Sequence, residues 1–396
     1  MNGLTDRASA YQKMKPRFMK LLSHSLACLM LLLLCAPAPA QETPLPGETA
    51  PEWAELFQRT NGWAGADGNF SVVLSPGKTL WLFSDTWVGE IRDGQRHHVR
   101  MINNSIAIQR GHDPATASVQ FFYRTNHDGS ADSFIKPEDG RGYFWLFAGL
   151  RNRHGLFFFP QQVETVKPGR TFGFRGIGSW LAVVKNPDAS PDQWPIKQHK
   201  LPFTRFDDEH RRTFGAAVWE EKGKVYVFGL QTLNPSGGSA RRTGMIAARV
   251  SASKLDQFSK WQFWDGKSWQ PDPEKVAIVC PDMASEFSVS YLPALKKYAV
   301  VYTEGGLFGR IKIRFAESPI GPWSQPHPLY DSPERAWEGV FCYAGKAHPH
   351  LSKNELILTY ASNTWKSEQV LRDARLYWPH FARVPMEKLR ELAEQK

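Results

Sequence analysis

Hydrophobic residues along this chain recur in short, strong runs and not in long helical patterns. The strongest runs are Thr79–Phe83, Tyr143–Phe147, Lys224–Phe228, Tyr298–Tyr302 and Glu355–Tyr360. Each run follows a turn of Gly, Pro, Asp, Asn, Ser or Lys residues, and each turn follows another short run: Asn69–Leu74, Ser133–Ile135, Thr213–Trp219, Glu286–Leu292 and Phe341–Ala347. Paired runs joined by such turns are typical of β-hairpins. The pattern predicts five hairpins, with a helix only near the C-terminus.

Segments that follow these hairpins also resemble one another. Ala248–Val250 with Leu255 recurs as Ala382–Val384 with Leu389, and Val183–Pro187 before Trp194 resembles Phe315–Pro319 before Trp323. Units of roughly 55–75 residues with three or four antiparallel strands are typical of propeller blades. We therefore predict an all-β fold, a five-bladed β-propeller with a short C-terminal helix. A β-sandwich would not explain five similar hairpins, and a β-solenoid would need shorter, more regular repeats.

The N-terminal residues have the pattern of an export signal. A basic stretch ending at Lys20 precedes an apolar run, Leu26–Leu34, and the small residues Ala38-Pro39-Ala40. The apolar run is short for a bilayer span. We expect a signal peptide over residues 1–40 cleaved near Ala40, a lead-in over 41–60, and a propeller domain over 61–396, in a secreted or periplasmic protein with no transmembrane span in the mature chain. A retained anchor, or a lipoprotein attached at Cys28 or Cys35, is the alternative.

Composition removes several classes of function. The formal charge is +10, but residues 1–40 hold five basic residues and one acid, and no Lys/Arg stripe follows, so nucleic-acid binding is not expected. Neither a glycine-rich phosphate loop nor a Gly-x-Ser-x-Gly elbow is present. Cys280 and Cys342 form either a disulfide or two buried thiols. No residues have the spacing of metal ligands, so we expect no metal or cofactor. We also expect the protein to be a monomer.

Acidic residues fall where a propeller would gather them. In a blade, the start of the first strand and the end of the second lie on the same face, around the axis. Asp67 and Asp85 occupy these two places in the first unit, and Glu286 and Glu304 occupy them in the fourth; both pairs are eighteen residues apart. These four acids are the predicted catalytic residues. Turn capping is the alternative role for the two aspartates, and an ion pair is the alternative for the two glutamates.

Aligning the first and fourth units on Phe70 and Phe287 instead sets Asn69, and not Asp67, opposite Glu286. Further polar or aromatic residues at or near the same strand ends are predicted to bind substrate: Asp132, Arg212, Gln231, Trp87, His348 and Asn363. Each also has an ordinary structural alternative: a solvated loop charge for Asp132, a turn histidine for His348, and a core or rim position for Trp87.

Two carboxyl groups that flank one bond are the machinery of glycoside hydrolysis, in which one donates a proton and the other attacks or activates water. Several acids in one funnel therefore predict a glycoside hydrolase acting on a polysaccharide or oligosaccharide. The alternatives are a non-catalytic carbohydrate-binding propeller and a structural envelope protein that holds a partner at its blade edges.

Two segments resemble a known family. The segment "DGNFSVVLSPGKTLWLFSDTWVG" with "NNSIAI", and the later "GKAHPHLSKNELILTYASN", are similar to the first and last blades of secreted five-bladed propellers long filed as a domain of unknown function. Some members of that family are endo-D-arabinanases. The resemblance covers Trp63 to Val384, is strong at both ends, and implies a glycosidase-like architecture with Asp67 and Asp85 in the chemistry. Ser84 stands where Gly is common in the family.

Overall fold

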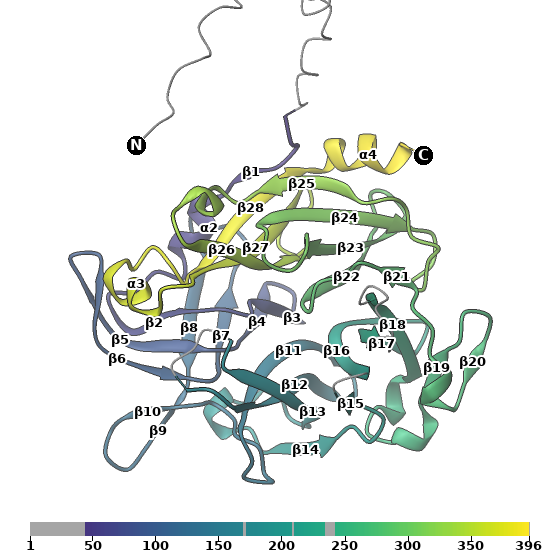
Figure 1. Cartoon of the computed structure of the whole chain (residues 1–396), viewed down its shortest axis with the longest axis horizontal. Helices are drawn as coiled ribbons and strands as arrows, with labels where there is room; N and C mark the ends of the chain where they lie inside the picture. Colours follow the sequence, from purple (N-terminus) through teal and green to yellow (C-terminus); the bar gives the residue numbers. More distant parts are fainter. Residues whose placement is uncertain (1–43, 169–171, 208–209, 234–241, 396) are drawn as a thin grey trace, which may run out of the picture. The chain divides into compact units, whose positions relative to one another are not determined.

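Short runs of β-branched and aromatic residues, separated by turns, form sheets that surround a common axis (Figure 1). The structure, a computed structural model, describes residues 44–168, 172–207, 210–233 and 242–395. Residues from Leu45 onward form one unit. The predicted signal peptide lies outside the described residues.

Five antiparallel blades make up this unit, in chain order around the axis. Blade 1 holds β3 (Phe70–Ser75), β4 (Lys78–Phe83), β7 (Ser105–Arg110) and β8 (Ser118–Phe122). Blade 2 holds β11 (Tyr143–Asn152), β12 (Gly155–Thr165), β13 (Phe174–Val184) and β14 (Ile196–Lys200). Blade 3 holds β15 (Arg205–Phe206), β16 (His210–Glu221), β17 (Lys224–Leu233), β18 (Arg242–Ser251), β19 (Gln262–Trp264), β20 (Trp269–Gln270) and β21 (Cys280–Pro281).

Blade 4 holds β22 (Phe287–Leu292), β23 (Lys297–Thr303), β24 (Arg310–Ala316) and β25 (His327–Asp331). Blade 5 holds β26 (Val340–Ala347), β27 (Glu355–Thr364), β28 (Pro379–Pro385) and, from the start of the chain, β1 (Glu48–Thr49). The ring thus closes within one sheet, because β1 pairs with β28 through Glu48–Arg383 and Thr49–Ala382.

The hydrophobic core is divided among the gaps between blades. Five clusters of buried side chains each join two neighbouring blades, and the last joins blade 5 to blade 1. Leu82 and Phe158 represent the first cluster, and Trp81 and Phe381 represent the last. Burial of apolar area in every gap is the main force that holds the ring together. The five-bladed propeller expected from the sequence is the observed fold.

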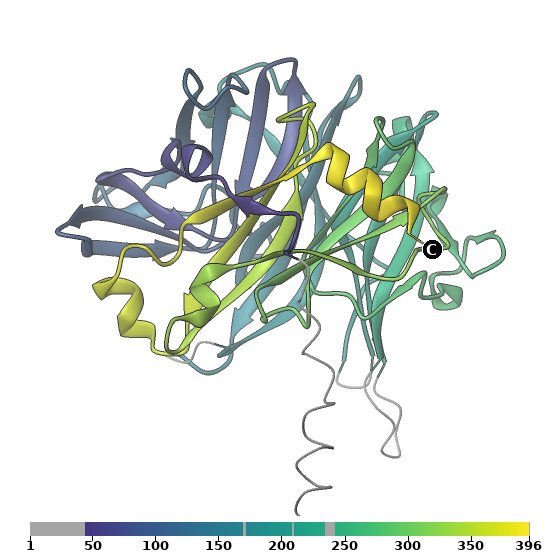
Figure 2. The same cartoon turned by 90° about the horizontal axis from the view of Figure 1, so that it is seen from above.

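Other elements lie outside the blades. A three-stranded sheet of β2 (Asn61–Ala66), β5 (Thr86–Arg92) and β6 (Gln95–Ile102) is inserted around blade 1, and β9 (Arg124–Thr125) pairs with β10 (Ala131–Asp132). The helices are α2 (Pro51–Glu55), α3 (Ser367–Arg372) and α4 (Met386–Glu394), with five short 3₁₀ turns elsewhere. Figure 2 shows α4 outside the sheets, where Leu389 is fully buried against the core between blades 4 and 5.

The second predicted hairpin was wrong. Ser133–Ile135 is not a strand, and the inner strand of blade 2 is β11, which was expected to be the second strand. Phe134 and Ile135 are apolar because they pack into the core between blades 1 and 2, while Asn104 holds the backbone of Ile135 through both its side-chain atoms at 2.9 and 3.0 Å. Periodicity alone does not separate a buried loop from a short buried strand.

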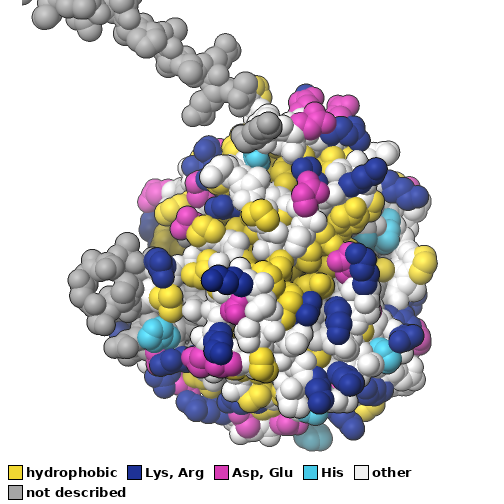
Figure 3. Space-filling view, turned by 90° about the vertical axis from the view of Figure 1, so that its right-hand side faces the viewer, with side chains coloured by type: hydrophobic (Ala, Val, Ile, Leu, Met, Phe, Trp, Pro, Cys, Tyr) yellow, Lys and Arg dark blue, Asp and Glu magenta, His cyan; other side chains and the backbone are white. Residues whose placement is uncertain are grey.

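Cys280 and Cys342 are free, buried thiols in different blades, so the disulfide alternative is wrong. No described helix is long and apolar enough to cross a bilayer. On the face drawn in Figure 3, basic and acidic side chains are interspersed with apolar ones.

Candidate active site

A cavity of about 680 Å³ opens at one end of the inner strands. Residues from every blade line it, including Asp85, Trp145, Thr213, Glu286 and Tyr343. A mostly apolar pocket with a few convergent polar groups is the usual form of a ligand site.

Asp67 lies in the loop between β2 and the inner strand β3, and it lines this pocket. Its Oδ2 accepts hydrogen bonds from the hydroxyls of Tyr343, at 2.6 Å, and Tyr377, at 3.1 Å, while its buried Oδ1 has no partner among the described residues. Burial raises the pKa of Asp67 well above its ordinary value, and repulsion from Asp85 and Glu286 raises it further. These surroundings favour the protonated form of Asp67, although the two tyrosine hydrogen bonds oppose the shift.

Asp85 follows β4 and lines the same pocket. Its Oδ1 accepts hydrogen bonds from the indole of Trp145, at 2.9 Å, and the amide of Asn103, at 3.1 Å. Burial raises the pKa of Asp85 to about 6, although these two bonds oppose the shift by stabilising the charged form. Asp85 therefore ionises near pH 6, while the pKa of the neighbouring Asp67 is also raised.

The backbone brings these two aspartates together. The amide of Asp67 donates to the carbonyl of Asp85 at 3.2 Å, and the amide of Ser84 donates to the carbonyl of Asp67 at 3.0 Å. Gly68 makes this approach possible: its φ is +88°, and a Cβ there would lie 2.9 Å from the nitrogen of Ser84.

Glu286 lies just before β22 and forms a buried ion pair with Lys346 of blade 5 at 2.8 Å. The Lys346 ammonium also donates to the carbonyl of Ala344 at 2.8 Å and lies 4.2 Å from the ring centre of Phe70. A bulge in β26 between Tyr343 and Lys346 turns the first side chain to Asp67 and the second to Glu286.

Glu304 does not join the other acids. It pairs with Lys312 on the neighbouring strand β24 and is absent from the pocket wall, where Gly305 stands. The register explains this, because Phe70 pairs with Leu82 as Phe287 pairs with Tyr302, so Ser84 corresponds to Glu304 and Asp85 to Gly305. The alignment that sets Asn69 opposite Glu286 is therefore the structural one.

Arg212 and Gln231 also face away from the pocket. Arg212 is buried, where it donates to the carbonyls of Phe203 and Pro273 at 2.9 Å and pairs with Glu274. Successive side chains of a strand point to opposite faces, so the pocket is lined by Arg211 and Thr213 of β16 and by Leu230 and Thr232 of β17.

The remaining predicted residues divide between the pocket and other places. Asn363 lines the pocket from β27. Asp132 pairs with Lys136 in the outer β9–β10 hairpin, and Trp87 lies in the inserted sheet. His348 is buried between Ser71, at 2.6 Å, and Thr359, at 2.7 Å, and lines a second cavity of about 320 Å³ along the inner strands.

Sequence reasoning missed Tyr343, Tyr377, Trp145 and Lys346. Tyr377 comes before β28, where the backbone is fixed by Arg96, whose guanidinium donates to the carbonyls of Ala64 and Leu376 at 2.9 and 2.6 Å. No local pattern marks these residues, since each becomes a partner of an acid only across a blade boundary. In the described part of the chain, no group of three or more His, Cys, Asp or Glu side chains is placed to hold a metal ion.

Comparison with known proteins supports the fold. A protein from Bacteroides ovatus, provisionally classed as a hydrolase, has a crystal structure that matches with a TM-score of 0.66 at 20% identity, over 88% of this chain and 93% of that one. A GH43_1 enzyme from Xanthomonas citri complexed with xylose matches at 0.43 and 12% identity, over 85% of this chain and 93% of that one. An α-L-arabinofuranosidase from Podospora anserina complexed with cellotriose matches at 0.43 and 11% identity, over 86% and 94%.

The support for the fold comes from the first of these matches, because the last two have TM-scores below 0.5 and carry no argument. A search of the curated proteins found no match. The family model described as a domain of unknown function, DUF5005, matches residues 51–387. With an Asp67–Asp85 pocket at the axis of a five-bladed ring and a family match over most of its length, the chain belongs to the DUF5005 family.

Proposed function

We propose that this chain is a glycoside hydrolase that uses Asp67 as general acid and Asp85 as base or nucleophile. The observation that carries the proposal is one pocket in which two neighbouring, hydrogen-bonded carboxyl groups both have raised pKa values, well above the ordinary value for Asp67 and to about 6 for Asp85. Environments that push two pKa values apart are the usual mark of an acid and base pair.

The roles follow from the hydrogen bonds. Both tyrosines bind Oδ2 of Asp67, which leaves Oδ1 to carry a proton toward the leaving glycosidic oxygen. As the bond between the anomeric carbon and that oxygen breaks, the oxygen takes the proton from Asp67. Asp85 either attacks the anomeric carbon or takes a proton from the water that does so. Trp145 and Asn103 hold its carboxylate in place.

The proposed substrate is a glycan met outside the cytoplasm, and a furanose-containing glycan of arabinan type is the first to test. The similarity of the first and last blades to propellers with endo-D-arabinanase members supports this choice, and the export signal expected over residues 1–40 supports the location. A secreted or periplasmic site is thus part of the proposal.

The test is incubation with arabinan, arabinogalactan and pectic glycans, with new reducing ends as the readout. D67N and D85N should each lower kcat by about 100- to 10,000-fold. D132N is the matched control, because Asp132 lies outside the pocket, and its rate should be unchanged.

The pH profile adds a second readout. The rate should rise as pH increases through about 6, where Asp85 ionises, and fall at higher pH, where Asp67 loses its proton. Glycan binding without new reducing ends in any mixture would instead indicate a carbohydrate-binding propeller and refute the hydrolase.

A further inference from the structure

An aromatic strip runs from the carboxylates out of the pocket. We give this name to Trp145, Phe174, Phe172, Phe341 and Trp365. Trp145 and Phe174 lie 4.6 Å apart between ring centres, Phe174 and Phe172 lie 6.0 Å apart, and Phe172 and Trp365 lie 5.4 Å apart. Phe341 contacts Trp365 at 4.7 Å. All but Trp365 line the pocket wall, so Trp365 extends that wall outward.

The outer members of the strip are unusually exposed. Trp365 is 53% exposed and Phe172 is 49% exposed, while most large apolar side chains of the described residues are buried. A contiguous exposed apolar surface that borders a pocket usually marks a binding site. The exposed rings of Trp365 and Phe172 can pack against the apolar faces of sugar rings, outward from Trp145, which is bonded to Asp85.

The strip is built from two blades and held in place at both ends. Trp145 is fixed by its bond to Asp85, and the amide of Trp365 donates to the carbonyl of Gly339 at 2.9 Å. Phe174 begins β13, and next to it Arg175 pairs with Glu164 of β12, which also binds Arg141 at 3.0 Å.

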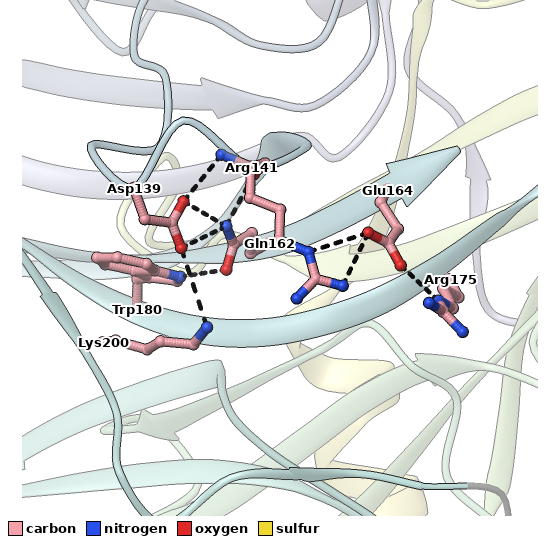
Figure 4. A network of polar contacts seen from close by, with 7 residues as sticks. All are labelled: Asp139, Arg141, Gln162, Glu164, Arg175, Trp180 and Lys200. Atoms are coloured by element: carbon pink, nitrogen blue, oxygen red, sulfur yellow. Dashed lines mark hydrogen bonds and ion pairs between the residues drawn. The ribbon is translucent and has the colours of Figure 1, made fainter. Parts of the chain in front are cut away.

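Figure 4 shows the ion pairs of Glu164 with Arg141 and Arg175, together with the neighbouring hydrogen bonds around Gln162. Gln162 donates to Asp139 at 2.8 Å and accepts from the indole of Trp180 at 2.9 Å. These contacts fix the end of β13 that carries Phe174, so the inner part of the strip is held in place without a ligand.

The charge of the pocket indicates which class of glycan, charged or neutral, it can bind. Asp67, Asp85, Asp282 and Glu286 line it, with Arg211 as the one cationic side chain among the described lining residues. Lys346 compensates Glu286, and Asp67 has a raised pKa, so Asp85 and Asp282 are the carboxylates that a ligand would meet beside Arg211. A uronic acid chain would bring further carboxylates close to Asp85, whereas a neutral glycan would not.

We propose that the aromatic strip binds sugar residues of a neutral glycan beyond the bond that is cut, so that the protein acts on chains of several sugar residues. The inference rests on the proposed function, and it adds the substrate class: a neutral oligosaccharide or polysaccharide and not a disaccharide. Contact between the strip and successive sugar rings then makes affinity increase with chain length.

The experiment measures binding by calorimetry in the D85N protein, which needs no turnover. The probes are linear arabino-oligosaccharides and xylo-oligosaccharides of two to six residues, with oligogalacturonate as the charged comparison. Affinity for one neutral series should rise with length. W365A should lower affinity for its longest member on the order of tenfold, which corresponds to about 1.4 kcal/mol, and F172A should act in the same direction.

M101A is the control, because Met101 is an exposed apolar residue of β6 away from the pocket. Affinity that does not depend on length, a preference for oligogalacturonate, equal binding by W365A, or no binding of any probe would each overturn the inference. The two proposals remain separable. Cleavage with length-independent binding refutes only the strip, and length-dependent binding without cleavage by the wild-type protein refutes only the hydrolase.

Discussion

At the scale of single residues, the site consists of two aspartates whose pKa values are both raised by burial, well above the ordinary value for Asp67 and to about 6 for Asp85. Asp67 has tyrosine hydroxyls on one oxygen and no partner on the other. Asp85 has two N–H donors on one oxygen. Tyr343 and Tyr377 are themselves held neutral, since burial raises the pKa of both phenols. Such an arrangement costs stability, because the folded protein is destabilised when an acid with a raised pKa ionises in it.

A pH-dependent gain in stability is therefore predicted for D85N. The folded pKa of Asp85 is about 6, and the unfolded value is about 3.9. Between these values the folded state binds more protons, so the unfolding free energy of the wild type falls as pH rises. Asn at this position removes that loss and keeps an oxygen for Trp145 and Asn103. Urea unfolding should show D85N more stable by on the order of 1 kcal/mol at pH 7.5, and by less at pH 5.

D331N is a control for which the opposite change in stability is expected. Two hydrogen bonds from Arg310, at 2.8 and 2.7 Å, lower the pKa of Asp331, so its charge stabilises the fold above the unfolded pKa. D331N should lose stability at pH 7.5. A D85N protein less stable than the wild type at that pH would contradict the assigned environment of Asp85.

At the scale of elements, the pocket depends on irregularities in the inner strands. The bulge in β26 sends Tyr343 to Asp67 and Lys346 to Glu286. The inner strands β11 and β16 also carry register shifts midway. The Glu286–Lys346 pair joins blade 4 to blade 5, and Lys346 is only 1% exposed, so this pair is desolvated and each charge depends on the other.

A double-mutant cycle tests this pair. K346M should lower the unfolding free energy by about 3–5 kcal/mol, because Glu286 is left as an uncompensated charge. E286Q with K346M should recover most of that loss, since the methionine can lie on the Phe70 ring that the lysine covered. K366M is the control: Lys366 and Glu338 lie 2.9 Å apart, but both are exposed, so K366M should leave the unfolding free energy nearly unchanged. A double variant no more stable than K346M would show that the two charges are not coupled.

At the scale of the whole ring, the start of the chain is fixed to blades 4 and 5 before it continues into blade 1. The amide of Gly47 donates to the carbonyl of Leu329 at 2.9 Å, and that of Ala50 donates to the carbonyl of Phe381 at 3.0 Å. Glu48 also pairs with Arg383 at 2.8 Å. Because the pocket takes residues from every blade, weakening this closure should affect the site and the fold together.

A truncation series tests the closure. A protein that begins at Leu45 keeps β1, whereas one that begins at Pro51 loses it. The shorter protein should lose on the order of 2–3 kcal/mol of unfolding free energy, from the missing backbone hydrogen bonds. R383Q removes the ion pairs of the half-buried Arg383 with Glu48 and Glu52 but leaves β1 in place, so it should lower the unfolding free energy less than the loss of β1 does. Equal stability of the two truncated proteins would mean that β1 does not close the ring.

The sequence alone was enough for the fold and for the placement of Asp67 and Asp85 at one end of the ring. Both depend on short-range patterns: alternating apolar runs and turns define hairpins, and an acid at a strand end remains at that end in any propeller. Four of the five predicted hairpins are inner strand pairs, β3–β4, β16–β17, β22–β23 and β26–β27. The remaining prediction, the second hairpin along the chain, was wrong because Phe134 and Ile135 are buried by packing and not by strand pairing.

Only the tertiary structure decided which neighbours each acid has. A shift of one residue moves a strand side chain to the other face, which is why Arg211 and Gly305 line the pocket where Arg212 and Glu304 were expected. The partners Tyr343, Tyr377 and Lys346 meet the acids only after the ring has closed. The chain thus encodes its strands and its acids locally, while protonation depends on burial and on contacts between distant blades, which no local pattern records.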